Sequence, residues 1–221
     1  MSFRKFLIVF PILLMVVASL YACAGQPAAQ DSKNVLFSDD FSQSSSGWTQ
    51  LKNENGTIAY AKDYYYIFVN KPGTLLLATP GKSFQGDVSI EVDARKIDGS
   101  DDNYFGILCH YQNPDNYYLL IVTSDGYSGI AMHKDGQDTL ISPGLKFLKM
   151  DGIKKGNATN HLRADCVGEA LTLYANGKQV SLAYNNLLTG GDAGLAVRSG
   201  RLEGGVDIRF NNFSVASPTQ P

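Results

Sequence analysis

Short apolar runs of the type found in strands recur along the chain from about residue 35 onward. Runs such as "GTIAYA", "YYLLIVTS" and "VDIRFNNFSV" are rich in Val, Ile, Tyr and Phe, and Gly, Asn or Asp residues lie between them. β-Branched and aromatic residues favour strands, whereas Gly, Asn and Asp favour the turns that connect strands. No helical spacing of apolar residues is sustained. The pattern predicts an all-β fold, and its many short, near-regularly spaced strands favour two packed antiparallel sheets over a small barrel.

The first 22 residues have the layout of a secretory signal peptide. Arg4 and Lys5 precede the apolar run "FLIVFPILLMVVASL", and small residues follow it. A single membrane span is the alternative. It is disfavoured because Pro11 interrupts the run and no basic stop-transfer cluster comes after it. Residues 1–22 are therefore predicted to be a signal peptide.

Leu20-Tyr21-Ala22-Cys23 resembles the bacterial lipobox, although Tyr21 departs from the usual small residue. The resemblance implies that the Cys23 thiol receives a diacylglycerol group and becomes the new N-terminus. Two or more acyl chains hold a protein stably on a membrane. We therefore expect an exported protein, lipid-anchored to the bacterial cell envelope and facing the periplasm or the exterior, with an ordinary cleaved secretory signal as the alternative. The expected organisation is a lipidated flexible tether at 23–33, a folded domain at 34–216 and a flexible tail at 217–221.

Three cysteines are present, and lipidation of Cys23 would leave Cys109 and Cys166 as an even pair. An exported protein folds in an oxidising compartment, so this pair predicts a disulfide. Two buried free thiols are the alternative. No CxxC or HxxxH spacing accompanies them, so the pattern does not indicate a zinc site.

The charge balance excludes one class of partner. The chain has 19 basic and 21 acidic residues, and Arg4 and Lys5 would be lost with the signal peptide, which leaves 17 basic residues. A nucleic-acid-binding surface requires a basic stripe or patch. The mildly acidic balance therefore predicts no nucleic-acid partner.

Several segments together resemble the concanavalin A-like lectin/glucanase superfamily, most closely the LamG-like domains of bacterial envelope lipoproteins. The matching segments are "DDFS…GW", "IEVDAR", "NYFGILCHYQNPDNYYLLIVTSDGYSGI", "LRADCVG", "LTLYANGKQV" and "VDIRFNNFSV". The resemblance implies a two-sheet antiparallel jelly roll over almost the whole mature chain. It specifies function poorly, because the superfamily includes lectins, adhesion modules and glycosidases.

The stretch "DVSIEVDARK" carries the first candidate site. It alternates strictly, so one face is apolar and should enter the core, while the other is polar and should lie on the open, usually concave, side of a sheet. The polar face predicts Glu91, Asp93 and Arg95 as ligand contacts. The apolar set is Val88, Ile90, Val92 and Ala94, and the polar set is Ser89, Glu91, Asp93 and Arg95.

Glu91-Val92-Asp93 is similar to the catalytic strand of laminarinase-type glycoside hydrolases, which reads Glu-x-Asp followed by a second Glu. A retaining glycosidase needs two carboxylates about 5 Å apart. Arg95 and Lys96 stand where the second Glu would be. We therefore predict no catalytic residue, unless another strand supplies the missing acid.

The tyrosine-rich stretch "NYFGILCHYQNPDNYYLLIV", residues 103–122, predicts a hairpin. A three-residue loop at Pro-Asp-Asn would place Cys109 opposite Leu119 and His110 opposite Tyr118. If Cys109 is crosslinked, its face points inward together with Leu119. His110 and Tyr118 would then lie on the outer face as candidate ligand contacts. His110 or His133, from neighbouring strands, could join Glu91, Asp93 and Arg95 there. A one-residue slip would re-sort these side chains.

The acidic loop "DGSDDN", residues 98–103, could supply oxygen ligands to calcium, but it lacks the EF-hand glycine and distant glutamate. A solvated turn is the alternative, and no cofactor is predicted.

The sequence favours a non-catalytic, surface-anchored recognition lipoprotein that binds carbohydrate or an envelope or extracellular partner. One alternative is a glycoside-acting enzyme on the same fold, either 3-keto-glycoside hydrolase-like or glycosidase-like. The other is a structural envelope accessory domain with no small ligand.

Overall fold

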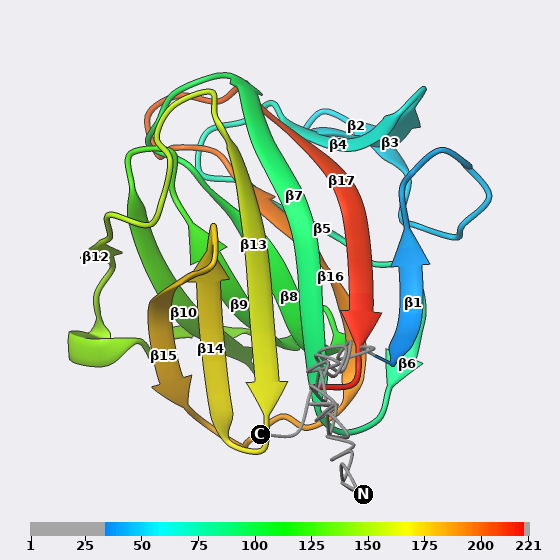
Figure 1. Cartoon of the computed structure of the whole chain (residues 1–221). Helices are drawn as coiled ribbons and strands as arrows, with labels where there is room; N and C mark the ends of the chain where they lie inside the picture. The colour runs from blue at the N-terminus through cyan, green and yellow to red at the C-terminus, as the bar shows by residue number, and fades with distance from the viewer. Residues whose placement is uncertain (1–33, 219–221) are drawn as a thin grey trace, which may run out of the picture. The chain divides into compact units, whose positions relative to one another are not determined.

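The computed structural model describes residues 34–218, which form two antiparallel sheets packed face to face (Figure 1). The predicted signal peptide of residues 1–22, Cys23, the tether to residue 33 and residues 219–221 lie outside the described residues. Within the described part, no helix is long and apolar enough to cross a membrane. The all-β, two-sheet prediction is confirmed.

Sheet A has nine strands in the described part of the chain, in the order β15-β14-β13-β7-β17-β4-β3-β2, with β1 also paired to β17. Strands β7 and β17 lie at its centre and carry the outward side chains of the candidate site. The strands are β1 (Val35–Asp39), β2 (Leu51–Asn53), β3 (Gly56–Ala61), β4 (Tyr64–Val69), β7 (Val88–Asp98), β13 (Thr159–Val167), β14 (Ala170–Ala175), β15 (Lys178–Tyr184) and β17 (Val206–Ala216).

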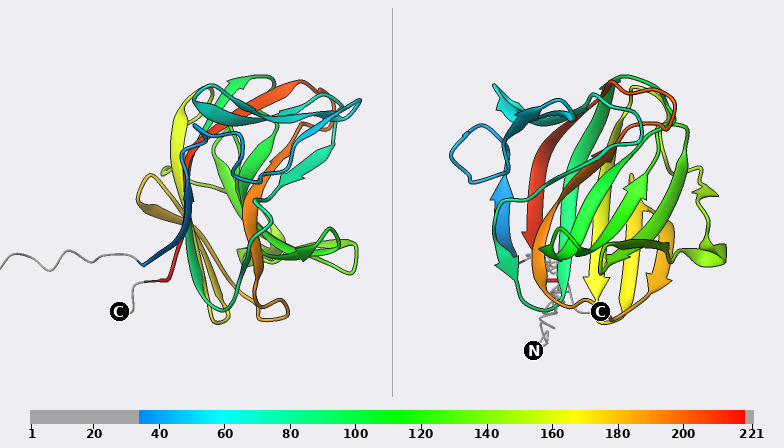
Figure 2. Two further views of the ribbon diagram at one scale, coloured as in Figure 1. Left: turned by 90° about the vertical axis from the view of Figure 1, so that its right-hand side faces the viewer. Right: turned by 180° about the vertical axis from the view of Figure 1, so that it is seen from behind.

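Sheet B has eight strands between residues 34 and 218, in the order β11-β10-β9-β8-β16-β5, with β12 paired to β10 and β6 paired to β16. The two sheets form separate layers when the molecule is seen edge-on (Figure 2, left). The strands are β5 (Leu75–Ala78), β6 (Ser83–Phe84), β8 (Tyr104–Asn113), β9 (Asn116–Val122), β10 (Tyr127–Lys134), β11 (Gln137–Leu140), β12 (Leu148–Lys149) and β16 (Gly191–Arg198), and one 3-10 turn, η1 (Pro143–Leu145), follows β11.

The apolar core lies between the two sheets. Alternation in β7 turns Ile90, Val92 and Ala94 fully inward, as the sequence predicts, and leaves the polar set on the outer face of sheet A. Burial of such side chains is the main force that holds two sheets together. Among residues 34–218, the members of this core, including the partly buried residues at its margin, lie between Phe37 and Val215. The core lies within the compact unit Ser32–Pro221.

The predicted disulfide between Cys109 and Cys166 is present and joins the two sheets. Cys109 lies in β8 of sheet B and Cys166 in β13 of sheet A, and both side chains are fully buried. The crosslink therefore ties the two layers together through the core.

The predicted register of the tyrosine-rich hairpin is wrong. The loop contains two residues, Pro114 and Asp115, because Asn113 pairs with Asn116. Between the pairs Asn113–Asn116 and Cys109–Tyr118, β8 has three residues, 110–112, whereas β9 has one, Tyr117. The excess forms a bulge in β8. Cys109 therefore lies opposite Tyr118 and not Leu119.

This bulge also overturns the predicted faces of the hairpin. Tyr118 points into the core and is fully buried, and Leu119 lies on the outer face of sheet B. His110, with a left-handed φ of 51°, is buried beside Tyr118, with 6.1 Å between the ring centroids. The prediction that His110 and Tyr118 lie on the outer face is therefore incorrect, because the bulge shifts the pairing by one residue.

Candidate functional site

Glu91, Asp93 and Arg95 lie on the outer face of sheet A, as predicted from the alternation in β7. Glu91 and Asp93 are partly buried and Arg95 is exposed. Strand β7 is central in this sheet, with β13 on one side and β17 on the other. Side chains from three adjacent strands can therefore meet over β7.

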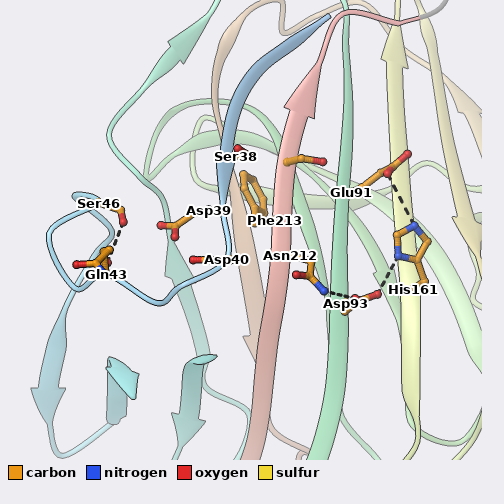
Figure 3. Close-up of a pocket in the computed structure, with 11 residues that line it drawn as sticks. Ser38, Asp39, Asp40, Gln43, Ser46, Glu91, Asp93, His161, Asn212 and Phe213 are labelled. Atoms are coloured by element: carbon orange, nitrogen blue, oxygen red, sulfur yellow. Dashed lines mark hydrogen bonds and ion pairs between the residues drawn. The ribbon is translucent and has the colours of Figure 1, made fainter. Parts of the chain in front are cut away.

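A hollow forms at this face because β17 changes partner along one edge. Phe210 of β17 pairs with Tyr65 in β4, whereas Phe213 pairs with Asp39 in β1. A bulge at the change gives Asn212 a left-handed φ of 54°, which Asn tolerates better than most residues. The hollow has a volume of about 760 Å³ (Figure 3). Its lining residues are Ser38, Asp39, Asp40, Gln43, Ser46, Glu91, Asp93, His161, Asn212, Phe213 and Ser214.

Asp93 is the centre of a hydrogen-bonded cluster in this hollow. The Asn212 amide Nδ2 donates to Asp93 Oδ2 at 2.8 Å, and His161 Nδ1 lies 2.8 Å from Asp93 Oδ1. An ionised carboxylate only accepts hydrogen bonds, so the Nδ1–H of His161 donates to it. Glu91 Oε2 lies 3.9 Å from His161 Nε2, which places the imidazole between two carboxylates (Figure 3). We call Glu91, Asp93, His161 and Asn212 the Asp93 cluster.

The opposite wall of the hollow is acidic. Asp39 Oδ1 accepts a hydrogen bond from the Phe41 backbone N–H at 2.7 Å, and Asp39 Oδ2 is buried without a hydrogen-bond partner in the described part of the chain. The hydroxyl and backbone N–H of Ser42 hold the pKa of Asp40 below its usual range. The hollow therefore offers several charged acceptors to a ligand that can donate hydrogen bonds.

Packed aromatic rings support the hollow from below. Phe213 lines it and packs edge-on against Trp48 with 4.7 Å between the ring centroids, and Phe41 packs against Trp48 at 5.2 Å. All three rings are buried. A floor of interlocked rings restricts movement of β17 beneath the polar side chains.

A second hollow of about 340 Å³ adjoins the first, and Asp93 lines both. Arg95 lines this second hollow with Arg209 of β17. The three predicted residues Glu91, Asp93 and Arg95 thus line two hollows on one sheet that share Asp93.

The other predicted contacts lie elsewhere. His110 and Tyr118 belong to the core between the sheets. His133 is on the outer face of sheet B, where its Nδ1 lies 2.6 Å from Asp138 Oδ1. The expectation that His110 or His133 joins Glu91 is incorrect, because both come from strands of sheet B.

Sequence reasoning missed His161 and Asn212. His161 lies five residues before Cys166 in β13, so alternation from an inward Cys166 would have placed His161 outward. Its position opposite Asp93 depends on the pairing of β13 with β7, which the sequence does not show. Asn212 is set by a bulge that alternation does not predict.

The outer face of sheet B carries stacked aromatic rings. Tyr111 and His133 stack on Tyr117 from neighbouring strands, with ring centroids 5.8 Å and 4.6 Å away and interplanar angles of 25° and 13°. Tyr117 is only 2 % exposed. Because its faces are occupied by protein rings, it offers no free face on which a sugar could stack.

Two features bear on metal binding. Among residues 34–218, the one group of three metal-ligating side chains with all ligand atoms within 4.8 Å is Cys109, His110 and Cys166, and both sulfurs are in the disulfide. In the acidic loop at 98–103, the Lys96 ammonium contacts Asp101 and donates to the Gly99 carbonyl at 2.8 Å. The lysine therefore supplies the positive charge that balances Asp101.

The fold is similar to solved structures of carbohydrate-related proteins. No protein-family model matches the chain, and no curated protein matches it. The carbohydrate-binding module CBM66 from Bacillus subtilis aligns with a TM-score of 0.61 and 21% identity, over 77% of this chain and 96% of that chain. A Bacillus subtilis protein of unknown function with a galectin-like fold aligns with a TM-score of 0.63 and 8% identity, over 83% and 96%. The Bacillus licheniformis β-glucanase aligns with a TM-score of 0.60 and 8% identity, over 85% and 100%. These likenesses confirm the predicted jelly-roll sandwich.

Proposed function

We propose that this chain is a non-catalytic, surface-anchored domain that binds carbohydrate in the hollow around the Asp93 cluster. The observation that carries the proposal is the arrangement of Asp93, whose two oxygens are held by His161 and Asn212 in an open, polar hollow. Structural similarity to a carbohydrate-binding module supports the choice of ligand class.

The chemistry of the hollow suits a ligand rich in hydroxyl groups. Carboxylate oxygens accept hydrogen bonds from sugar hydroxyls, whereas amide and imidazole N–H groups donate to them. Glu91 and Asp93 supply the acceptors, and His161 and Asn212 supply the donors. Because Asp93 is already fixed by two hydrogen bonds, less conformational entropy is lost when a ligand binds beside it.

The anchoring part of the proposal concerns Cys23. Its support is the lipobox resemblance of Leu20, Ala22 and Cys23 together with the preceding apolar run. Expression of the full chain in a bacterium, with labelled palmitate in the medium, tests it. The wild-type chain should carry label and sediment with membranes, and Cys23→Ser should lose the label. Equal labelling of the two chains would contradict lipidation at Cys23.

A glycan array tests the binding function on Ser32–Pro221, which is one compact unit of the chain. Each array is run with calcium and with a chelator, so that metal dependence is read separately. The wild-type segment should bind a defined set of glycans, and Asp93→Asn should bind them at least tenfold more weakly because it removes a charged acceptor. The control is Asp151→Asn, which removes the same charge from an exposed loop position. Absence of binding to every glycan would overturn the proposal.

A second candidate, a glycoside-acting enzyme, is favoured by the position of His161 between Glu91 and Asp93. A histidine oriented by one carboxylate can act as a general base, and a second carboxylate nearby can act as an acid. Turnover of a sugar panel that is lost in both Glu91→Gln and His161→Ala would favour this function. Equal turnover by wild type and Glu91→Gln would contradict a role for Glu91.

A further inference from the structure

The second hollow on sheet A contains two arginines that the proposed function does not yet use. It adjoins the hollow of the Asp93 cluster and has a volume of about 340 Å³. A row of residues paired across four strands runs through this region, from Thr159 through Arg95 and Arg209 to Tyr66. The residues that line the hollow are Tyr64, Asp93, Arg95, Ile97, Thr159, Arg209 and Asn211.

Arg95 and Arg209 lie directly opposite each other in the β7–β17 pair. Like charges in such positions destabilise a sheet unless a counter-charge lies near them. Arg95 is exposed and makes no ion pair or side-chain hydrogen bond with residues 34–218. Arg209 Nη2 lies 3.7 Å from Asp207 Oδ2, and Arg209 Nε is buried without a hydrogen-bond partner among the described residues. The two guanidinium groups therefore keep N–H donors and positive charge available to a ligand in the hollow.

Tyr64 holds one of these arginines in place. The Arg209 guanidinium lies 4.3 Å from the centre of the Tyr64 ring, an arrangement stabilised by cation–π attraction. This contact holds the guanidinium against the ring of Tyr64, and Arg209 still lines the hollow. A guanidinium fixed in this way loses little freedom when it binds a planar anion.

The carboxylate that lines this hollow is hydrogen-bonded to residues other than the two arginines. Asp93 is the one acidic side chain among the described lining residues. Its Oδ1 is paired with His161 and its Oδ2 with Asn212. Since both oxygens are directed to other partners, an anion from outside can occupy the space in front of Arg95 and Arg209.

We infer that the Arg95–Arg209 hollow binds the anionic group of an acidic sugar while the Asp93 cluster binds hydroxyl groups of the same chain. The inference rests on the proposed function and narrows it to glycans that carry carboxylate or sulfate groups. Guanidinium groups bind both anions through paired N–H donors. The shared border of the two hollows at Asp93 allows neighbouring groups of one ligand to reach both.

Isothermal titration of Ser32–Pro221 with three oligosaccharides tests the inference. The probes are an oligogalacturonide, the same chain with its carboxyl groups reduced to alcohols, and a sulfated heparin oligosaccharide. The variants are Arg95→Gln and Arg209→Gln, with Arg209→Lys as a charge-retaining variant. Arg201→Gln is the matched control, because it removes the same charge from an exposed residue that does not line the hollow. Thermal melting verifies that every variant is folded.

At least one anionic probe should bind more tightly than the reduced chain. Each Arg→Gln change should weaken that binding by about tenfold to a hundredfold, and Arg201→Gln should leave it unchanged. The difference should shrink as salt concentration rises. Two results would overturn the inference and leave carbohydrate binding intact. One is equal affinity for the anionic probes and for the carboxyl-reduced oligosaccharide. The other is unchanged affinity for the anionic probe in both Arg→Gln variants. If the protein binds none of these probes but binds neutral glycans on the array, the inference about acidic sugars is overturned and the proposed carbohydrate binding is retained. Failure to bind any glycan would overturn both.

Discussion

Asp93 and His161 face each other across the β7–β13 pair, with 2.8 Å between Asp93 Oδ1 and His161 Nδ1. The contact joins the central strand of sheet A to its neighbour at an open polar surface. Asn212 completes the arrangement from β17 on the other side. Three strands that are distant in sequence thus place an acid, an imidazole and an amide at one point.

The His161–Asp93 contact predicts a binding defect without a folding defect. The His161 side chain is 48% exposed, so His161→Ala should change the free energy of unfolding little. It removes a charge-assisted hydrogen bond partner of Asp93 and should weaken glycan binding about tenfold or more. The control is His133→Ala, which breaks an equivalent contact to Asp138 on sheet B. Titration calorimetry that gave equal affinities for the two variants would count against the Asp93 cluster.

The disulfide between Cys109 and Cys166 predicts a reductant-sensitive stability. It closes a loop with a sequence separation of 57, which corresponds to about 4 kcal/mol in the chain-entropy model. Urea unfolding of wild type should therefore shift to lower denaturant in the presence of a dithiol reductant. The double variant Cys109→Ala/Cys166→Ala should show the lower stability with or without reductant. An identical wild-type transition in both conditions would show that no disulfide forms in solution.

Burial of His110 predicts a pH-dependent stability. Desolvation lowers the pKa of His110 below its ordinary 6.5, so the unfolded state binds the proton more readily than the folded state. The free energy of unfolding should therefore fall as pH drops below about 6.5 and be unaffected by His110 above it. His110→Asn removes the titration and suits the left-handed backbone at this position. Urea unfolding at several pH values should show a shallower acid slope for His110→Asn. An unchanged slope would mean that His110 is not desolvated.

Gly106 predicts a large loss of stability on a small substitution. A Cβ atom there would lie 2.2 Å from the Leu120 carbonyl oxygen, which belongs to the backbone of the paired strand and cannot easily move. Gly106→Ala should cost about 3 kcal/mol. Gly81→Ala is the comparison, since a Cβ at Gly81 meets no atom within 4 Å and its φ of 70° alone should cost about 1 kcal/mol. Equal denaturation midpoints for the two variants would contradict this packing of β8 against β9.

The sequence predicts most of the fold because alternation and turn residues are local signals. The inward face of β7 and the outward Glu91 and Asp93 follow from period-two alternation alone. The disulfide follows from cysteine parity together with the expectation that the chain is exported. Both predictions depend on residue types at known spacings and need no knowledge of which strands pair.

The rest of the site depends on pairing and on bulges. The bulge that buries His110 shifts the register after a Pro-Asp loop, and turn residues alone do not specify it. The contact between Asp93 and His161 requires β13 to lie beside β7, although 68 residues separate the two side chains in sequence. Asn212 reaches Asp93 because β17 bulges where its partner changes. Non-local pairing of this kind is the information that a single sequence lacks.

Amide chemical-shift mapping of Ser32–Pro221 with a glycan selected on the array is the decisive test of carbohydrate binding at the Asp93 cluster. We expect shifts concentrated at residues of sheet A that line the first hollow, namely Glu91, Asp93, His161 and Asn212. It also predicts that the amides of Tyr117 and His133, in the ring stack on sheet B, stay unchanged. Shifts confined to the ring stack would contradict carbohydrate binding at the Asp93 cluster.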